Sequence, residues 1–342
     1  MMGTQEKAAQ NTPERVVRTT TGERRLALVS GRSNPGLAQA IADKLNVELT
    51  SSLIKNFADG ETHVSIDESI RDADVFVIQS TCRPVNHNYM ELFVLIDAIS
   101  RSSPRSITVI LPYYGYSRQD RKARGRESIS AALVATLIGA SGDVTRVVTL
   151  DLHSPQIQGF FPMKKGDHFY ATLSLTEWIR DNWLQKQLEA VIVSPDAGGV
   201  NRARTFAKKL ELPLAVIDKR RPAHNTAEIH HIIGDVEGRV AIMIDDMVDT
   251  GGSVVKGAEA LMANGATQVY VAATHGLLSG HALKNIRESC ITEVAITDSI
   301  PHFFDERDAK IKIVSVAPLF ADVILRIFYG RPVSDIIGWI GG

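Results

Sequence analysis

Residues 239–253 read R-V-A-I-M-I-D-D-M-V-D-T-G-G-S, an apolar run followed by three aspartates and two glycines. The apolar run predicts a buried β-strand over 239–244, and the pattern of residues 252–263 predicts a helix directly after the turn. Crowded carboxylates repel one another, so each must stay solvated or find a cationic partner. A buried strand that ends in such a cluster therefore indicates a ligand-binding turn.

The turn itself has the features of an anion site. Free backbone N–H groups and the helix dipole favour an anion at a helix N-terminus, and glycine lets a phosphate approach the backbone closely. Hydroxyl side chains add donors, while the adjacent carboxylates upstream can accept hydrogen bonds from sugar hydroxyls. We therefore predict a phosphorylated sugar at this loop; the alternative is a capped helix with surface aspartates. The residues concerned are Asp245, Asp246, Asp249, Thr250, Gly251, Gly252 and Ser253.

The rest of the chain alternates short apolar runs with longer helical patterns. Strands are expected at 26–30, 74–79, 107–111, 146–150, 190–194, 214–217, 239–244 and 268–274, and helices at 35–45, 87–101, 129–140, 172–188, 198–210, 252–263 and 317–329. Continuous apolar runs indicate strands covered on both faces, and hence parallel α/β sheets. This alternation of strands and helices occurs about twice along the chain. We predict a flexible tail at 1–24 and two α/β domains, at 25–167 and 168–342.

Composition narrows the class of protein further. The 342 residues are 44% hydrophobic and 23% charged with a formal net charge of −1, so neither a nucleic-acid nor a membrane partner is expected. The two cysteines, Cys82 and Cys290, cannot form a disulfide framework and lack metal-ligand spacing. No apolar run approaches the roughly 20 residues of a membrane span. We expect a cytoplasmic protein.

Several segments together resemble a known family. The stretch D-D-M-V-D-T-G-G is similar to the phosphoribosyl-diphosphate motif of type I phosphoribosyltransferases. Residues 26–337 as a whole resemble ribose-phosphate pyrophosphokinase. The segments that carry this resemblance are N-F-A-D-G-E (56–61), P-Y-Y-G-Y-S-R-Q-D-R-K-A-R-G-R-E (112–127), D-L-H-S-P-Q-I-Q-G-F-F (151–161), S-P-D-A-G-G-V-N-R-A-R (194–204) and D-K-R-R-P (218–222).

This resemblance implies a fold and a reaction. The fold would comprise two phosphoribosyltransferase-like (type I) domains, each a mainly parallel sheet flanked by helices. The reaction would transfer the β,γ-diphosphoryl group of Mg-ATP to the 1-hydroxyl of ribose 5-phosphate. Its products would be AMP and 5-phosphoribosyl 1-diphosphate, used for nucleotide, histidine and tryptophan biosynthesis.

The resemblance also implies catalytic and metal-binding residues. Lys219 and Arg221 would stabilise charge that develops on the transferred group, the lysine as a point charge and the arginine as a fork. His153 would contact both ATP and magnesium and take part in catalysis, and Asp196 would be the second magnesium-site residue. One carboxylate with phosphate oxygens and retained waters suffices for Mg²⁺.

A basic stretch is the candidate nucleotide loop. Residues 118–126 contain five cations and one anion, a composition that is also typical of a solvated surface loop. By resemblance, residues 117–127 form a mobile loop that closes over ATP and excludes water, with Arg118 and Gln119 against the nucleotide.

Two further sets of residues carry implied roles. Phe57, Asp59 and Glu61 would bind the adenine of ATP held by a neighbouring subunit, in a homo-oligomer that is commonly a hexamer. Ser69 and Arg71 match a regulatory site where phosphate activates and ADP inhibits; the alternative is a strand-end turn with a surface arginine.

Departures from the family pattern and two alternative functions remain. His87 stands where Asp is usual, Ser128 replaces a proline, and the C-terminus differs. A phosphoribosyltransferase would use the same sugar-phosphate loop but would need neither the basic loop nor the Asp151-Leu152-His153 segment. A non-catalytic associated subunit would keep the fold and lose the cationic loop or Lys219, and this sequence retains both.

Overall fold

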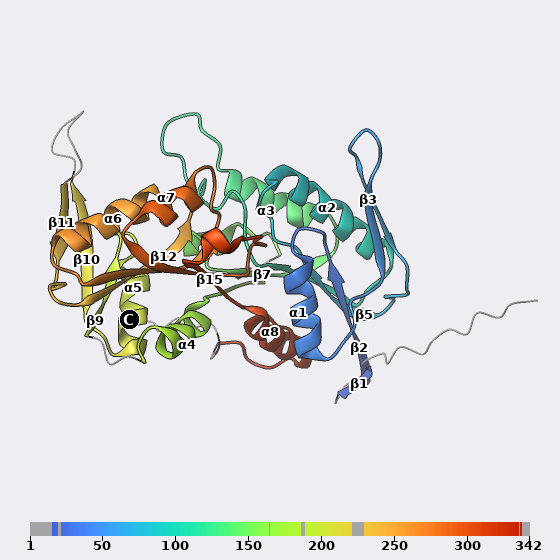
Figure 1. Cartoon of the computed structure of the whole chain (residues 1–342). Helices are drawn as coiled ribbons and strands as arrows, with labels where there is room; N and C mark the ends of the chain where they lie inside the picture. Colours follow the sequence, from blue (N-terminus) through green and yellow to red (C-terminus); the bar gives the residue numbers. More distant parts are fainter. Residues whose placement is uncertain are drawn as a thin grey trace, which may run out of the picture.

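The computed structural model describes residues 16–19, 22–163, 165–185, 189–220, 229–334 and 336. The described residues form two sheets that lie end to end, with helices on both sides of each (Figure 1). The first sheet has the order β1-β2-β5-β6-β7-β8, and β1 is its antiparallel strand. Its strands are β1 (Val16–Thr19), β2 (Gly22–Ser30), β5 (Ala73–Ile78), β6 (Ser106–Leu111), β7 (Val144–Leu150) and β8 (Gly166–Phe169).

The second sheet has the order β11-β10-β9-β12-β13-β14-β15, and its antiparallel strand is β11. Its strands are β9 (Ala190–Ser194), β10 (Leu214–Arg220), β11 (Ile229–Ile233), β12 (Val240–Val248), β13 (Gln268–Gly276), β14 (Ile291–Thr297) and β15 (Ile311–Val314). A separate antiparallel hairpin, β3 (Ser52–Asn56) and β4 (Thr62–Ile66), projects from the N-terminal half (Figure 1).

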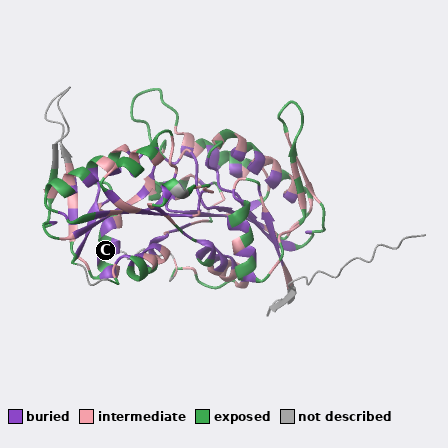
Figure 2. Cartoon of the chain, in the orientation of Figure 1, coloured by how far each residue is buried: buried purple, intermediate pink, exposed green. Residues whose placement is uncertain are grey.

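Helices connect the parallel strands and cover their faces. They are α1 (Pro35–Leu45), α2 (Val85–Arg101), α3 (Ser130–Ala140), α4 (Thr172–Asn182), α5 (Val200–Leu210), α6 (Gly252–Ala263), α7 (Ala282–Glu288) and α8 (Ala317–Tyr329), with the short 3₁₀ helices η1 (Pro155–Phe160) and η2 (Glu306–Asp308). The inner strands of the two sheets, β5, β6, β9, β12 and β13, are mostly buried between these helices (Figure 2). Burial on both faces explains why the strands read as continuous apolar runs.

The two halves share one hydrophobic core. A single cluster contains Leu28 and Leu150 of the first sheet together with Ile192 and Ile242 of the second. Helix α8 follows the last strand of the second sheet yet packs against α1 of the first half. The Arg24 guanidinium secures this contact because it donates to the Phe328 carbonyl at 2.6 Å and lies over the Phe328 ring. The halves are therefore held together by apolar burial as well as by their connecting chain.

The prediction of parallel α/β sheets is confirmed, and three details differ from it. Strand β12 does not end at residue 244 but continues through the aspartates to Val248, because β13 pairs with it as far as Gly276. The sheet also begins inside the predicted tail, since β1 pairs with β2 over residues 16–19. Strand β8 pairs with β7, so the predicted domain boundary at 167/168 falls inside a strand of the first sheet.

No helix in the ranges described above is long and apolar enough to span a membrane.

Candidate active site

The aspartate–glycine turn leads from β12 into α6. Gly251 is the N-cap of α6 with φ +78°, a left-handed conformation that glycine adopts without strain. Among the described residues no side chain caps this helix, so its first-turn N–H groups remain available to a ligand. Two hydrogen bonds from neighbouring segments fix the backbone of this turn. Asn285 Nδ2 donates to the Thr250 carbonyl at 3.0 Å, and Ser279 N donates to the Asp249 carbonyl at 3.0 Å.

A cluster of buried charges lies beside this turn. His153 Nδ1 is 2.7 Å from Asp246 Oδ2 and joins the end of β7 to β12. Arg202 of α5 lies between two carboxylates, 3.8 Å from Asp246 and 3.8 Å from Asp151. Asp151 is itself fixed by Thr274 Oγ1 and by the Ala171 amide, which both donate to its Oδ2. The cluster therefore links both halves of the molecule at the carboxyl ends of their central strands.

The protonation states within the cluster follow from burial and from neighbouring charge. The hydrogen bond to Asp246 raises the pKa of His153 and outweighs burial. Burial alone would raise the pKa of Asp246, but the His153 bond and the Arg202 charge hold that pKa well below its usual range. Burial and then the Asp246 charge raise the pKa of Asp245 to about 8. Near neutral pH Asp245 and Asp246 together thus carry one negative charge instead of two.

Replacing Asp246 with asparagine tests this assignment through His153. The His153–Asp246 bond contributes stability that is fully present below the ordinary imidazole pKa of about 6.5 and is lost as the pH rises through the raised value. Asp246→Asn removes the charge that raises the pKa, so the His153 titration followed by NMR without Mg²⁺ should move to lower pH. An unchanged His153 midpoint would show that Asp246 is not the cause, while a distant histidine such as His63 provides the internal control.

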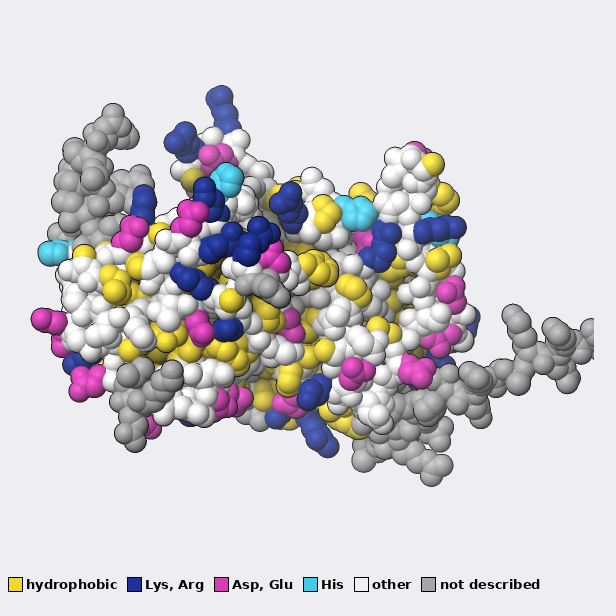
Figure 3. Space-filling view, viewed as in Figure 1, with side chains coloured by type: hydrophobic (Ala, Val, Ile, Leu, Met, Phe, Trp, Pro, Cys, Tyr) yellow, Lys and Arg dark blue, Asp and Glu magenta, His cyan; other side chains and the backbone are white. Residues whose placement is uncertain are grey.

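The basic loop reaches the same turn. Arg118 donates to Asp249 Oδ2 at 2.6 Å, although 131 residues separate the two in the sequence. Gln119 accepts a hydrogen bond from Ser130 at the start of α3. Lys and Arg side chains project from the outer part of this loop into solvent (Figure 3). Arg118 and Gln119 line a cavity of about 570 Å³ together with Tyr113, Tyr116, Ser279 and His302.

A second cavity, of about 650 Å³, lies next to the charge cluster. His153 and Arg202 line it together with Gln156, Gln158, His168 and Asn201. His168 is buried, and its Nε2 accepts the Leu152 amide at 2.9 Å; burial lowers its pKa to about 4. This histidine is therefore a neutral structural residue at neutral pH, whereas His153 is half exposed at the cavity wall.

The other implied catalytic and metal residues are placed as follows. Asp196 lies in the β9–α5 turn, where its Oδ1 accepts the Gly199 amide at 2.9 Å and the carboxylate is exposed. The backbone of Lys219 lies in β10, but its side chain and the whole of Arg221 lie outside the described residues. Within the described ranges no group of three or more His, Cys, Asp or Glu side chains could hold a metal ion.

The implied adenine and regulatory residues lie away from this cluster. Phe57, Asp59 and Glu61 are exposed at the tip of the β3–β4 hairpin, at the end of the molecule opposite β10 and β11 (Figure 1). Ser69 and Arg71 are exposed in the turn before β5, where Arg25 donates to both of their carbonyls. The structure therefore brings His153, Arg118 and the 245–253 segment together and leaves these two sets apart from them.

Sequence analysis missed Arg202 and the structural role of Asp151. The Arg202 Nε is buried and has no hydrogen-bond partner within the described part of the chain. Its helix segment V-N-R-A-R was recognised only as part of a motif, and nothing in the periodicity separates Arg202 from the exposed Arg204. Only the fold reveals that Arg202 neutralises two buried carboxylates.

Fold and site together define a protein of the type I phosphoribosyltransferase-like class, with a glycine turn at the end of a parallel strand that leaves the start of α6 without a side-chain cap. A family model described as the N-terminal domain of ribose phosphate pyrophosphokinase matches residues 26–142, and one described as the phosphoribosyl synthetase-associated domain matches residues 219–337. The chain belongs to the ribose-phosphate pyrophosphokinase family.

Individual relatives agree with this assignment. The ribose-phosphate pyrophosphokinase of Caldanaerobacter subterraneus is 53% identical over 311 residues, which cover 91% of this chain and 97% of that protein. The enzyme of the same name from Bacillus subtilis is 46% identical over 313 residues, or 92% of this chain and 97% of that one. The crystal structure of phosphoribosylpyrophosphate synthetase from Mycobacterium smegmatis matches with a TM-score of 0.83 at 42% identity, covering 89% of this chain and 99% of that one.

Proposed function

We propose that the chain transfers the β,γ-diphosphoryl group of ATP to the 1-hydroxyl of ribose 5-phosphate and releases AMP and 5-phosphoribosyl 1-diphosphate. One observation carries this proposal beyond the family assignment: Arg118 of the basic loop lies 2.6 Å from Asp249 of the anion turn. A loop suited to a nucleotide polyphosphate and a turn suited to a sugar phosphate therefore face one another, as direct transfer between two bound substrates requires.

The ribose 5-phosphate acceptor is assigned to residues 245–253. The available amides at the start of α6, with the hydroxyls of Thr250 and Ser253, suit its phosphate. Asp245 and Asp246 suit the ribose hydroxyls, and the two carboxyls differ in role because Asp245 has a pKa of about 8 while Asp246 stays ionised. A protonated carboxyl can donate to a sugar oxygen, and an ionised one can accept from a hydroxyl.

ATP is assigned to the space beside the basic loop. Arg118 and Gln119 line the 570 Å³ cavity, and His153, whose pKa is raised by its bond to Asp246, lines the 650 Å³ cavity. The raised pKa favours the protonated imidazole, and a protonated imidazole suits a polyphosphate anion. We assign Lys219 and Arg221 to the charge that develops on the transferred group, by resemblance and because β10 ends at the same edge of the sheet as β9 and β12.

Mg²⁺ is proposed as the cofactor, held largely by ATP. The exposed carboxylate of Asp196 and the His153 side chain are the protein groups that would contact it. So sparse a protein ligand set fits magnesium, which keeps waters and takes phosphate oxygens. The ion would neutralise charge on the polyphosphate, while the protein orients the substrates and excludes water.

A homo-oligomer is proposed because the implied adenine residues at the hairpin tip lie apart from the charge cluster and the 245–253 segment of the same chain (Figure 1). Phe57, Asp59 and Glu61 at the hairpin tip would serve the nucleotide site of a neighbouring subunit. By resemblance we propose the N-terminal half, whose sheet ends with β8 at Phe169, as the ATP side and the C-terminal half as the ribose 5-phosphate side, with the outer part of loop 117–127 closing over ATP. Phosphate and ADP remain candidate effectors, with Ser69 and Arg71 as their candidate residues.

The identity of the nucleotide product tests the proposed reaction. Protein with ribose 5-phosphate, Mg²⁺ and ATP should yield AMP and 5-phosphoribosyl 1-diphosphate in equal amounts, measured by anion-exchange chromatography and ³¹P NMR. Formation of ADP would contradict the proposal, because ADP signals γ-phosphoryl transfer. Reaction mixtures without ribose 5-phosphate control for ATP hydrolysis.

A further inference from the structure

The β3–β4 hairpin is joined to the body of the molecule through few elements. It forms a two-stranded sheet of its own, and α2 packs against β4. Its tip is well defined internally, since the Phe57 amide donates to the Glu61 carbonyl at 2.8 Å and the Gly60 amide donates to the Phe57 carbonyl at 3.0 Å. A two-stranded hairpin is only marginally stable in water, so its direction depends on the contacts that join it to the body of the molecule.

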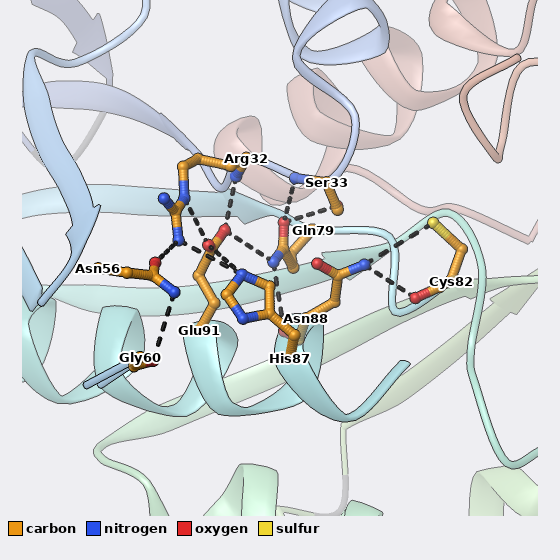
Figure 4. Close-up of polar contacts among 9 residues, drawn as sticks. All are labelled: Arg32, Ser33, Asn56, Gly60, Gln79, Cys82, His87, Asn88 and Glu91. Carbon is orange, nitrogen blue, oxygen red and sulfur yellow. Dashed lines mark hydrogen bonds and ion pairs between the residues drawn. The ribbon is translucent and has the colours of Figure 1, made fainter. Parts of the chain in front are cut away.

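Arg32 makes such a contact (Figure 4). It lies in the turn between β2 and α1, and its guanidinium donates to Asn56 Oδ1 at the end of β3. Asn56 Nδ2 in turn donates to the Gly60 carbonyl at 3.3 Å. The chain of bonds thus runs from the body of the N-terminal half directly into the loop that carries Phe57, Asp59 and Glu61.

A fully buried carboxylate fixes Arg32. Glu91 of α2 is 0% exposed; its Oε2 accepts Arg32 Nε at 2.7 Å, and its Oε1 accepts the Arg32 amide at 2.6 Å. Gln79 Nε2 adds a bond to Glu91 Oε1 at 3.1 Å. A buried carboxylate requires a cation, and the planar guanidinium can bond Glu91 through one nitrogen and Asn56 through another. A lysine has no such fork.

His87 lies at the same junction, one turn before Glu91 on α2. Its Nε2 is 3.4 Å from the Arg32 guanidinium and 3.7 Å from Glu91 Oε2. The hairpin, the β2–α1 turn and α2 therefore meet at one polar cluster, which consists of Arg32, Asn56, His87 and Glu91. Arg32 is the member that contacts each of the other three.

We propose that Arg32 is a positioning residue for adenine recognition: held by Glu91, it directs the hairpin tip through Asn56 toward the nucleotide site of a neighbouring subunit. This inference rests on the proposed function, because it takes Phe57 as an adenine contact. Arg32 itself touches no substrate. Its loss should therefore weaken ATP binding without affecting ribose 5-phosphate or the chemical step.

Steady-state kinetics of the full-length protein test the proposal. Arg32→Met and Asn56→Leu should each raise KM for ATP about 5- to 10-fold, as expected for one lost anchoring hydrogen bond, with kcat and KM for ribose 5-phosphate within about twofold of the unmodified protein. Asn56→Leu leaves the Arg32–Glu91 pair intact and so separates the anchoring effect from loss of folding. Asn56→Asp keeps the acceptor for Arg32 and loses the donor to the Gly60 carbonyl, so its KM for ATP should lie between those of Asn56→Leu and the unmodified protein.

Two further variants make the result decisive. Arg105→Met is the matched control, because the Arg105 side chain also pairs with a carboxylate, that of Asp72, and is 37% exposed, against 38% for Arg32; its KM values should not change. Phe57→Ala tests the underlying assignment. If Phe57→Ala raises KM for ATP while Arg32→Met and Asn56→Leu do not, the positioning role is overturned and the adenine assignment stands.

Two other outcomes would also count against the proposal. No effect of Phe57→Ala on KM for ATP would overturn the adenine assignment and the positioning role with it. Equal increases of both KM values in Arg32→Met and Asn56→Leu, accompanied by lower melting temperatures, would assign the cluster a purely structural role.

Discussion

Lys219→Ala is expected to lower kcat for AMP formation by at least about 100-fold, the effect typical of removing one group that stabilises transition-state charge. The reason is electrostatic: diphosphoryl transfer involves little covalent work by the protein, so a cation that stabilises developing negative charge acts on the chemical step. Strand β10 carries this residue to the edge of the sheet that also bears Asp196 and the 245–253 segment. Rapid-quench measurement of AMP formation checks kcat directly.

A measurement of ribose 5-phosphate binding distinguishes a role of Lys219 in the chemical step from a role in substrate binding. Calorimetry should give a dissociation constant for Lys219→Ala within about twofold of the unmodified protein, since the proposed acceptor residues lie on β12 and α6. Lys208→Ala, which removes an exposed lysine from α5, is the control and should leave kcat unchanged. Weakened ribose 5-phosphate binding with an unchanged kcat would contradict the assigned role.

Arg202→Met is expected to lower the free energy of unfolding by about 3–5 kcal/mol, the cost typical of breaking a buried ion pair by removing one partner. Arg202 is only 19% exposed and lies 3.8 Å from both Asp151 and Asp246, whose side chains are 3% and 8% exposed. Without it these carboxylates remain buried with less positive charge to offset their repulsion. Chemical denaturation followed by far-UV circular dichroism measures the change.

The neighbouring Arg204 provides a matched control for this experiment. It lies on the same helix two residues later, is exposed, and contacts Asn201 at 3.4 Å. Arg204→Met should therefore change the free energy of unfolding by less than about 0.5 kcal/mol. If both variants lost a similar free energy of unfolding, the effect of Arg202→Met would come from changing an arginine on helix α5 and not from the buried charge cluster.

Much of the fold was predictable because its signals are local. The ranges predicted for α1, α6 and α8 match the structure, and the buried strands read as continuous apolar runs. Strand β14 was missed because I-T-E-V-A-I-T interrupts its apolar run with polar residues. The β3–β4 hairpin was missed because β3 is largely exposed, β4 is only half-buried, and neither strand carries a sustained apolar pattern.

The candidate site was predictable segment by segment, but not as an arrangement. Each motif was recognisable where it stands in the chain, whereas the contacts that join motifs span long separations, 93 residues for His153–Asp246 and 131 for Arg118–Asp249. Arg202 and Glu91 were missed altogether, since their importance comes from buried partners on other elements. Periodicity carries no information on such partners.

The sequence by itself determined most of the element types and the glycine turn before α6, because hydrophobic periodicity, the left-handed glycine at 251 and the start of α6 depend on residues adjacent in the chain. Only the tertiary structure decided the state of the aspartates. Burial and then the charge of the neighbouring Asp246 raise the pKa of Asp245 to about 8, while His153 and Arg202, which come from distant parts of the chain, hold the pKa of Asp246 low. Electrostatic free energy depends on distance in space and on exclusion of water, and neither can be read from the order of residues.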